Sequence, residues 1–248
     1  MSRRRFFAPP EAFSKQTVTL TGDEARHLRE VLRLKTGDEV FIFDGAGKEF
    51  RCTIDSARRD ETLLSQCEEV APNRPESPLR LTLAVALLKG EKFDLVVQKA
   101  TELGVTGIVP MMTRYADIRL RDASDAEKRV TRWRRIAVEA AKQSGRAFVP
   151  PMVLPLPFET VMDDSDYSSR LMFSERNGLH LAEALKSESQ PASVIAMVGS
   201  EGGWADEEIS AASNAGWRIL TLGGRVLRAE TAAIAAMVLL QHLWGDLR

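Results

Sequence analysis

The chain has 248 residues, of which 44% are hydrophobic and 28% charged, and its formal net charge is −1. This composition is typical of an ordinary globular protein with a sizeable core, and the net charge alone indicates no nucleic-acid partner. The apolar run Ala232–Leu240 is far shorter than the roughly 18–20 residues that span a bilayer. The first residues lack the apolar core of a signal peptide, so we expect a cytoplasmic protein.

Charge is unevenly distributed along the chain. Residues 1–35 hold eight Lys and Arg against four Asp and Glu, residues 36–71 hold four against nine, and residues 119–146 hold nine against four. Positive charge gathered in two places is what a phosphate-binding surface requires, although solvated helix faces would give the same pattern.

The two cysteines, Cys52 and Cys67, lie on neighbouring segments that resemble strands. They are too few for a disulfide framework and badly spaced for zinc. We therefore expect two reduced, half-buried thiols and no metal site.

Residues 71–78 contain three prolines, which neither donate to a sheet ladder nor continue a helix. They predict a linker between a first domain, residues 1–71, and a second domain, residues 79–248. In the first domain the expected strands are Thr17–Leu20, Val40–Phe43, Phe50–Ile54 and a short one at Leu63–Leu64. The two longer central strands flank a turn at residues 44–47. A small β-barrel is the expected result.

One helix is expected in the first domain. It follows Thr21, whose spacing to Glu24 matches a capping box. Helical periodicity places three apolar residues on one side and three arginines on another. The apolar residues are Leu28, Val31 and Leu32, and the arginines are Arg26, Arg29 and Arg33.

The second domain alternates between apolar strand patterns and helical patterns. This alternation predicts an α/β domain with a mostly parallel sheet. The expected strands are Leu79–Leu88, Val105–Met111, Leu171–Phe173, Val194–Val198 and Trp217–Leu222. The expected helices are Glu91–Leu103, Asp125–Gln143, Leu181–Leu185, Asp206–Ala215 and Glu230–Trp244.

The last helix has no polar face between Ala232 and Leu240. A helix that is apolar all round must be covered on all sides. Either it is central in its domain or a second subunit covers it, and we favour the second subunit because a C-terminal element usually lies at the surface.

Two glycine-rich segments, Val198–Gly203 and Leu222–Ala232, each follow an expected strand and precede a helix. Glycine lets backbone N–H groups approach a ligand closely, and open α/β sheets bind ligands at the carboxyl ends of their strands. The spacing is that of neither a dinucleotide fingerprint nor a phosphate-binding Walker loop. We therefore predict that these segments hold a ligand largely through main-chain groups. The alternative is that they are only tight turns and bind no ligand.

These two segments together resemble the C-terminal signature of the SPOUT methyltransferases, and most closely that of the RsmE family. Members of that family mostly carry proline where this chain has Ser200. Further matching residues are Arg26–Leu28 with Val31–Arg33, Lys89 and Lys92, Gln98–Val105, and Glu139 with Gln143–Arg146.

The resemblance implies an S-adenosylmethionine-dependent enzyme that methylates N3 of a uridine in small-subunit (16S) ribosomal RNA. It implies a PUA-like RNA-binding β-barrel at residues 1–71 and a knotted α/β methyltransferase domain, with a trefoil knot, at residues 79–248. It also implies a homodimer with no membrane association, and it leaves open whether free RNA or the assembled 30S particle is the substrate.

The expected site residues follow from the glycine loops, the charge pattern and the resemblance. Those expected to bind the cofactor are Phe173, Gly199, Glu201, Gly202, Gly203, Leu222, Gly223, Leu227, Arg228 and Thr231. Those expected to bind RNA are Arg3, Arg4, Arg5, Arg26, Arg29, Arg33, Lys89, Lys92, Arg132, Arg135 and Arg146.

Uridine N3 carries a proton at neutral pH, so its methylation needs a base or a cation that stabilises the developing oxyanion. Glu201 and Glu230 are the candidate bases, and Arg146 and Arg228 are the candidate stabilisers. Each could instead form an ion pair that orients a ligand.

Two other function classes stay open on the sequence. A non-catalytic ribosome-assembly factor would use the same basic surfaces without binding a methyl donor. A small-molecule enzyme would use the glycine loops for phosphate and would not bind RNA.

Overall fold

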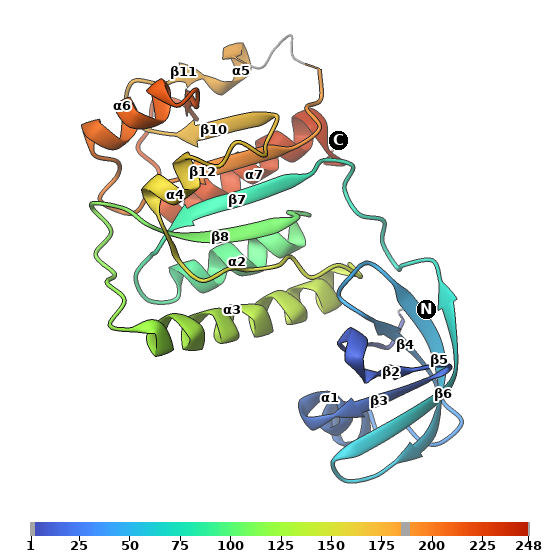
Figure 1. The fold of residues 1–248 in the computed structure, drawn as a ribbon. Coiled ribbons are helices and arrows are strands. Elements are labelled where there is room, and N and C mark those ends of the chain that lie inside the picture. Colours follow the sequence, from blue (N-terminus) through green and yellow to red (C-terminus); the bar gives the residue numbers. More distant parts are fainter. Residues whose placement is uncertain (1–2, 185–188, 248) are drawn as a thin grey trace. The chain divides into compact units, whose positions relative to one another are not determined.

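The computed structural model describes residues 3–184 and 189–247. The chain forms two compact units (Figure 1): unit 1 combines Met1–Glu76 with Val138–Val149, and unit 2 combines Ser77–Ala137 with Pro150–Arg248. The chain first passes between the units inside the proline-rich residues 71–78. The expected division into two continuous segments misses the return of Val138–Val149 to unit 1, because helix α3 (Ala123–Ser144) belongs to both units.

Unit 1 is built on one six-stranded sheet. Its strands are β1 (Arg5–Phe7), β2 (Phe13–Ser14), β3 (Thr17–Thr21), β4 (Glu39–Phe43), β5 (Glu49–Ala57) and β6 (Glu61–Val70), in the order β1-β4-β5-β6-β3-β2. β1 runs parallel to β4 and the other pairs are antiparallel. Alternate side chains such as Phe6, Ile42 and Ile54 are fully buried in one core cluster. A short 3-10 helix, Pro10–Ala12, precedes β2.

The basic helix of unit 1 differs from the expectation. α1 spans only Gly22–Arg26 and continues as a π-helix over His27–Val31. Arg33 then has a φ of +53°, in the left-handed region. Because a π turn is wider than an α turn and the left-handed residue reverses the chain, Arg33 does not continue one helix face with Arg26 and Arg29. The expected shared face is therefore wrong.

The expected capping box is also wrong. The side chain of Thr21 makes no hydrogen bond to the first turn of α1. The Glu24 carboxylate instead accepts hydrogen bonds from the Phe7 N–H at 3.3 Å and from the Lys142 ammonium at 2.8 Å. Long-range partners thus replace the local cap that the spacing suggests.

The cysteines of unit 1 are not free thiols. Cys52 and Cys67 form a disulfide between β5 and β6, with their Cα atoms 4.2 Å apart. The expectation of two reduced thiols is wrong, because pairing of the two strands brings residues 15 positions apart in sequence into contact.

Unit 2 is an α/β unit with a seven-stranded sheet in which all pairs are parallel. Its strands are β7 (Leu81–Ala86), β8 (Gly107–Met112), β9 (Leu156–Pro157), β10 (Ser169–Phe173), β11 (Leu179–His180), β12 (Val194–Val198) and β13 (Arg218–Thr221), in the order β11-β13-β10-β12-β7-β8-β9. Its helices, besides α3, are α2 (Lys92–Glu102), α4 (Phe158–Met162), α5 (Leu181–Ala184), α6 (Asp206–Asn214) and α7 (Ala229–Trp244). The expected helix at 181–185 ends at Leu185, which lies outside the described residues.

The sheet of unit 2 is covered on both faces, which explains why its central strands β7 and β12 are buried throughout and almost entirely apolar. Ile195 and Met197 of β12 pack with α4 and α6 in one core cluster. The alternate residues Val194, Ala196 and Val198 are also buried, and α7 packs against β12 and β7. The continuous apolar character of β7 and β12 therefore reflects helices on both sides.

The last helix is covered on one side only within the chain. Ala233, Met237 and Leu240 are fully buried, whereas Val238 is 38% and Leu243 is 42% exposed. The helix is therefore not central in unit 2. None of the described helices has the length and apolar character that a bilayer span requires.

Candidate functional site

A cavity of about 380 Å³ lies at the carboxyl ends of β10, β12 and β13 of unit 2. Two loops form most of its wall: the first glycine loop, residues 199–203, follows β12, and the second glycine loop, residues 222–228, follows β13. β12 and β13 lie on either side of β10 in the sheet. Because parallel strands end at the same edge of the sheet, the two loops meet there.

The first glycine loop is a tight turn, closed by a 3.0 Å hydrogen bond from the Gly203 N–H to the Ser200 carbonyl. A Cβ on Gly202 would lie 2.7 Å from the Tyr115 carbonyl oxygen, and one on Gly199 would lie 3.0 Å from the Trp204 ring. Packing inside unit 2 therefore leaves no room for a side chain at Gly202, whereas one at Gly199 would require the Trp204 ring to shift by a few tenths of an ångström. We expected Gly202 to serve ligand access, but its missing side chain first makes room for the backbone of Tyr115.

The walls of the cavity combine apolar surface with polar groups. Phe173, Val198, Leu222 and Leu227 supply the apolar part. Ser200 is buried, and its hydroxyl oxygen has no hydrogen-bond partner among the described residues. A ligand with a flat apolar ring and several polar groups fits such a wall.

Lys92, the first residue of α2, also lines the cavity. Its ammonium donates to the Glu201 carboxylate at 2.8 Å, and the Lys89 backbone N–H donates to the same oxygen at 3.2 Å. Partial burial raises the pKa of the Glu201 carboxyl, but the hydrogen bonds from Lys92 and from backbone N–H groups outweigh it, so its pKa lies below the ordinary value. Glu201 is therefore ionised and a weak base at neutral pH.

Most residues expected to bind the cofactor line this cavity. Those that do are Phe173, Gly199, Glu201, Gly202, Gly203, Leu222, Gly223, Leu227 and Arg228. Thr231 is exposed on the first turn of α7 and does not line it. Glu230, a candidate base, is buried and also does not line it.

Sequence reasoning did not place Ser174, Trp204 or Lys92 in the cavity wall, where all three lie. Ser174 follows the end of β10. Lys92 follows β7, which is the neighbour of β12 in the sheet. The position of Lys92 shortly after a strand indicates a place at the same edge of the sheet as the glycine loops, but only once the strand order is known.

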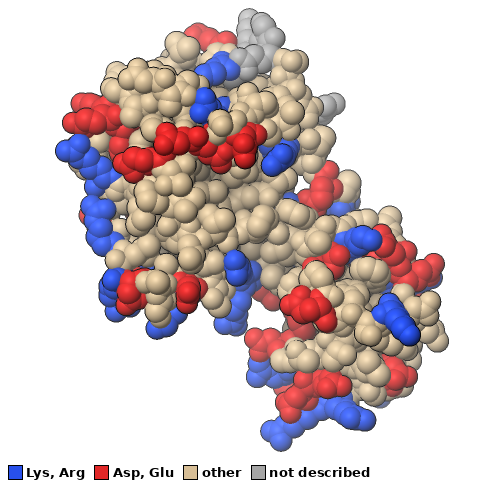
Figure 2. All heavy atoms as spheres, viewed as in Figure 1, with Lys and Arg blue, Asp and Glu red and all other residues tan. Residues whose placement is uncertain are grey.

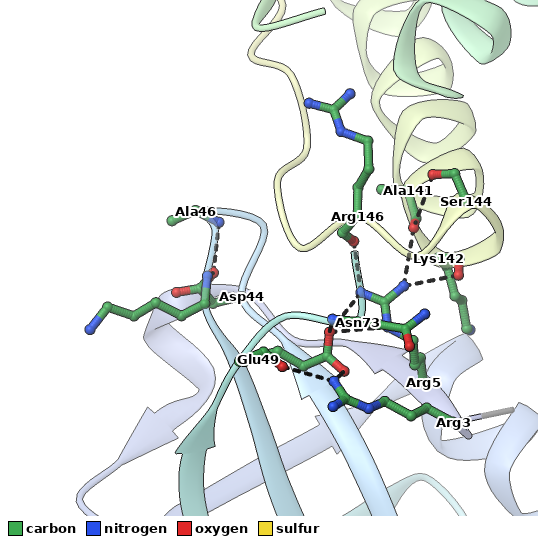
Figure 3. Close-up of polar contacts among 12 residues, drawn as sticks. Arg3, Arg5, Asp44, Ala46, Glu49, Asn73, Ala141, Lys142, Ser144 and Arg146 are labelled. Carbon is green, nitrogen blue, oxygen red and sulfur yellow. Dashed lines mark hydrogen bonds and ion pairs between the residues drawn. The ribbon is translucent and has the colours of Figure 1, made fainter. Parts of the chain in front are cut away.

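Three arginines expected to bind RNA are instead held in polar contacts inside unit 1 (Figure 3). The Glu49 carboxylate is fully buried and accepts hydrogen bonds from Arg3 at 2.8 Å and Arg5 at 3.1 Å. Arg5 also donates to the carbonyls of Ala141, Lys142 and Arg146, at the end of α3. Arg146 itself is buried and forms a 2.6 Å ion pair with Glu76. The expected roles of Arg5 and Arg146 in RNA binding are corrected, because both guanidinium groups are buried and engaged.

Of the remaining expected RNA-binding residues, Arg29 and Lys92 are half-buried and the others are exposed, and several are paired. Arg26 pairs with Asp23, Arg29 with Glu30, Lys89 with Asp117 and Arg132 with Asp94. Arg4, Arg33 and Arg135 are exposed. Figure 2 shows Lys and Arg side chains along the lower edge of unit 2, where α3 runs, interspersed with Asp and Glu. The local excess of positive charge is therefore partly balanced by neighbours from other segments.

Two family models match the chain. The model described as RNA methyltransferase domain matches residues 75–241, and the model described as RNA methyltransferase PUA domain matches residues 20–64. Together with the parallel sheet and the cavity at its edge, they define an RNA methyltransferase that carries a PUA domain.

Individual relatives show which family of RNA methyltransferases the chain belongs to. The chain is 34% identical over 242 residues to ribosomal RNA small subunit methyltransferase E of Synechocystis sp., covering 96% of this chain and 77% of the relative. The solved structure of that enzyme from Neisseria gonorrhoeae, bound to S-adenosyl methionine, is 34% identical and superposes with a TM-score of 0.87 over all of both chains. A Legionella pneumophila protein solved with bound cofactor SAM gives 32% identity and a TM-score of 0.90 over all of both chains. The chain belongs to the ribosomal RNA small subunit methyltransferase E family, the RsmE family of SPOUT methyltransferases.

Proposed function

We propose that the protein methylates N3 of a uridine in small-subunit ribosomal RNA, with S-adenosylmethionine as methyl donor. The cavity between the two glycine loops of unit 2 is the observation that carries the proposal. Support comes from the relatives of the same family, one of which was solved with S-adenosyl methionine bound at 34% identity to this chain.

The residues of the cavity suit this donor. The apolar side chains of Phe173, Leu222 and Leu227 can cover an adenine ring, and the glycine loops offer backbone N–H and carbonyl groups at close range. The unpartnered Ser200 hydroxyl offers one more polar contact. When bound, the donor supplies an electrophilic methyl group, and the chain has to present an uncharged or anionic nitrogen to it.

Among the expected catalytic residues, Arg228 is best placed to act, because it lines the cavity with its guanidinium in an exposed position. The low pKa of Glu201 makes it a poor proton acceptor, so we propose an orienting role for it. Glu230 lies outside the cavity wall, and Arg146 is buried against Glu76 in unit 1.

We further propose that the protein acts in the cytoplasm as a homodimer on ribosomal RNA in the 30S particle, and that its methyltransferase domain is knotted. The half-covered helix α7 supports the dimer, since Val238 and Leu243 leave an apolar face open. The PUA-type unit 1, with exposed Arg4 and Arg33, supports RNA binding by a surface of unit 1.

Nucleoside mass spectrometry of ribosomal RNA tests the proposal. A strain that lacks the protein should lose one 3-methyluridine from small-subunit RNA, and the wild-type gene should restore it. An unchanged content of 3-methyluridine would reject the proposed function, whatever RNA the protein binds.

A further inference from the structure

Three cationic side chains line the cavity, and they differ in how firmly they are held. Arg225 and Arg228 lie on the exposed second glycine loop. Lys92 is fixed in the first turn of α2, and its side chain is only 34% exposed. A cation that is already in place stabilises charge without reorganisation, and this favours Lys92 over the two arginines.

The Lys92 ammonium is held by Glu201, whose carboxylate has a second hydrogen-bond donor. Glu201 accepts its hydrogen bond at 2.8 Å with a side chain that is 22% exposed. The same carboxylate oxygen accepts the Lys89 backbone N–H, and the Lys89 ammonium pairs with Asp117 at 2.7 Å. An ammonium has three N–H donors, so the bond to Glu201 leaves Lys92 able to donate to a ligand in the cavity.

We propose that Lys92 is a catalytic residue that donates a hydrogen bond to a carbonyl oxygen of the target uracil and so stabilises the anion formed when N3 loses its proton. This inference rests on the proposed function and adds to it the group that activates the nucleophile. Glu201 is then a positioning residue, which holds the ammonium at the wall of the cavity.

The chemistry of uracil explains the need for such a cation. N3 lies between two carbonyl groups, so the electron pair left by deprotonation is shared with both oxygens. The proton passes to solvent. N3 then forms a bond to the methyl carbon as the carbon–sulfur bond breaks, and that electron pair stays on sulfur. A cation at a carbonyl oxygen lowers the N3 pKa of the bound base and raises the fraction that can react.

Substituting Lys92 and varying the N3 pKa of the substrate together test this role. The single-turnover methylation rate of Lys92→Gln would be measured against pH on 30S particles assembled from small-subunit RNA that was transcribed with uridine or with 5-fluorouridine, whose N3 is more acidic. We expect a loss of roughly 100-fold on uridine at neutral pH, the size typical of removing one oxyanion donor. The loss should shrink on 5-fluorouridine and at alkaline pH, where N3 ionises without help.

Lys89→Gln is the matched control, because Lys89 lies three residues away, pairs with Asp117 and does not line the cavity. Any loss in that variant should be the same on both RNAs. Donor affinity, measured by calorimetry, should be the same for Lys92→Gln and wild type, and Lys92→Arg should recover part of the rate.

A loss in Lys92→Gln that is equal on both RNAs at every pH would overturn the catalytic role, and so would the absence of a loss. Weakened donor binding that accounts for the whole loss would also overturn it. If wild type transferred no methyl to either RNA, the proposed function itself would fail, which is a separate and distinguishable result.

Discussion

Substituting Gly202 by alanine should weaken methyl-donor binding through the shape of the first glycine loop. A Cβ at this position would lie 2.7 Å from the Tyr115 carbonyl oxygen and 2.8 Å from the Tyr115 Cβ, whereas ordinary contact begins at 3.4 Å. The two segments would have to separate by about 0.7 Å, the difference between 3.4 and 2.7 Å. The neighbouring atoms belong to backbone and Cβ, which cannot rotate away.

The size of the effect follows from the cost of overpacking. Forcing extra atoms into a packed site costs about 1–3 kcal/mol. If the loop has to return to its native shape to bind the donor, this cost lowers donor affinity by about 5- to 150-fold. Isothermal titration calorimetry with S-adenosylmethionine measures it, and circular dichroism checks that the variant is folded.

Gly224→Ala is the matched control in the second glycine loop. A Cβ there would meet no atom within 4 Å, and its backbone is outside the left-handed region. This variant should bind the donor as wild type does. Equal donor affinity for folded Gly202→Ala, Gly224→Ala and wild type would refute the reasoning, because the tight approach to Tyr115 would then have no bearing on binding.

Further outcomes are expected in other parts of the chain. Glu49→Gln should lower the free energy of unfolding by about 3–5 kcal/mol in urea titrations, because two arginines lose a fully buried charged partner. Val238→Glu, a change at a 38% exposed position, should yield a folded monomer in light scattering if α7 forms the dimer interface. The pKa of the Glu201 carboxyl lies below its ordinary value, so its ion pair with Lys92 stabilises the site at pH values above that ordinary pKa and is lost as the pH falls through the lowered pKa. Donor affinity of the wild type should therefore fall on acidification. The same dependence of donor affinity on pH in Glu201→Gln would contradict this. Reducing the Cys52–Cys67 disulfide should destabilise unit 1 by up to about 3 kcal/mol, as seen in urea titrations with and without reductant.

The sequence was sufficient for most of unit 2, because its elements carry strong local signals. The apolar run Val194–Val198 is a strand with the expected bounds, and Asp206–Asn214 ends one residue before the expected end of its helix. The glycine segments predicted the cavity, since each follows a sheet strand and glycine has a specific use at such turns. Strands of two residues, β9 and β11, carry too short a pattern to be recognised.

The errors come from contacts between residues far apart in sequence. The sequence alone suggests that Arg5 is a surface cation. It is buried because it contacts Glu49, 44 positions along the chain, and carbonyl groups at the end of α3, at least 136 positions along the chain. The Lys92–Glu201 pair joins residues 109 positions apart. Local periodicity contains no information on such pairs, and charge counts in a segment do not show which charges are neutralised by other segments.

Methyl transfer by the purified protein tests the central assignment most directly. Small-subunit RNA and assembled 30S particles from a strain lacking the protein would be incubated with S-adenosylmethionine and the protein, then digested and analysed by nucleoside mass spectrometry. The assignment predicts new 3-methyluridine at one position with wild type and much less with Gly202→Ala. No methylated nucleoside on either substrate, or a methyl group on another base or atom, would contradict it.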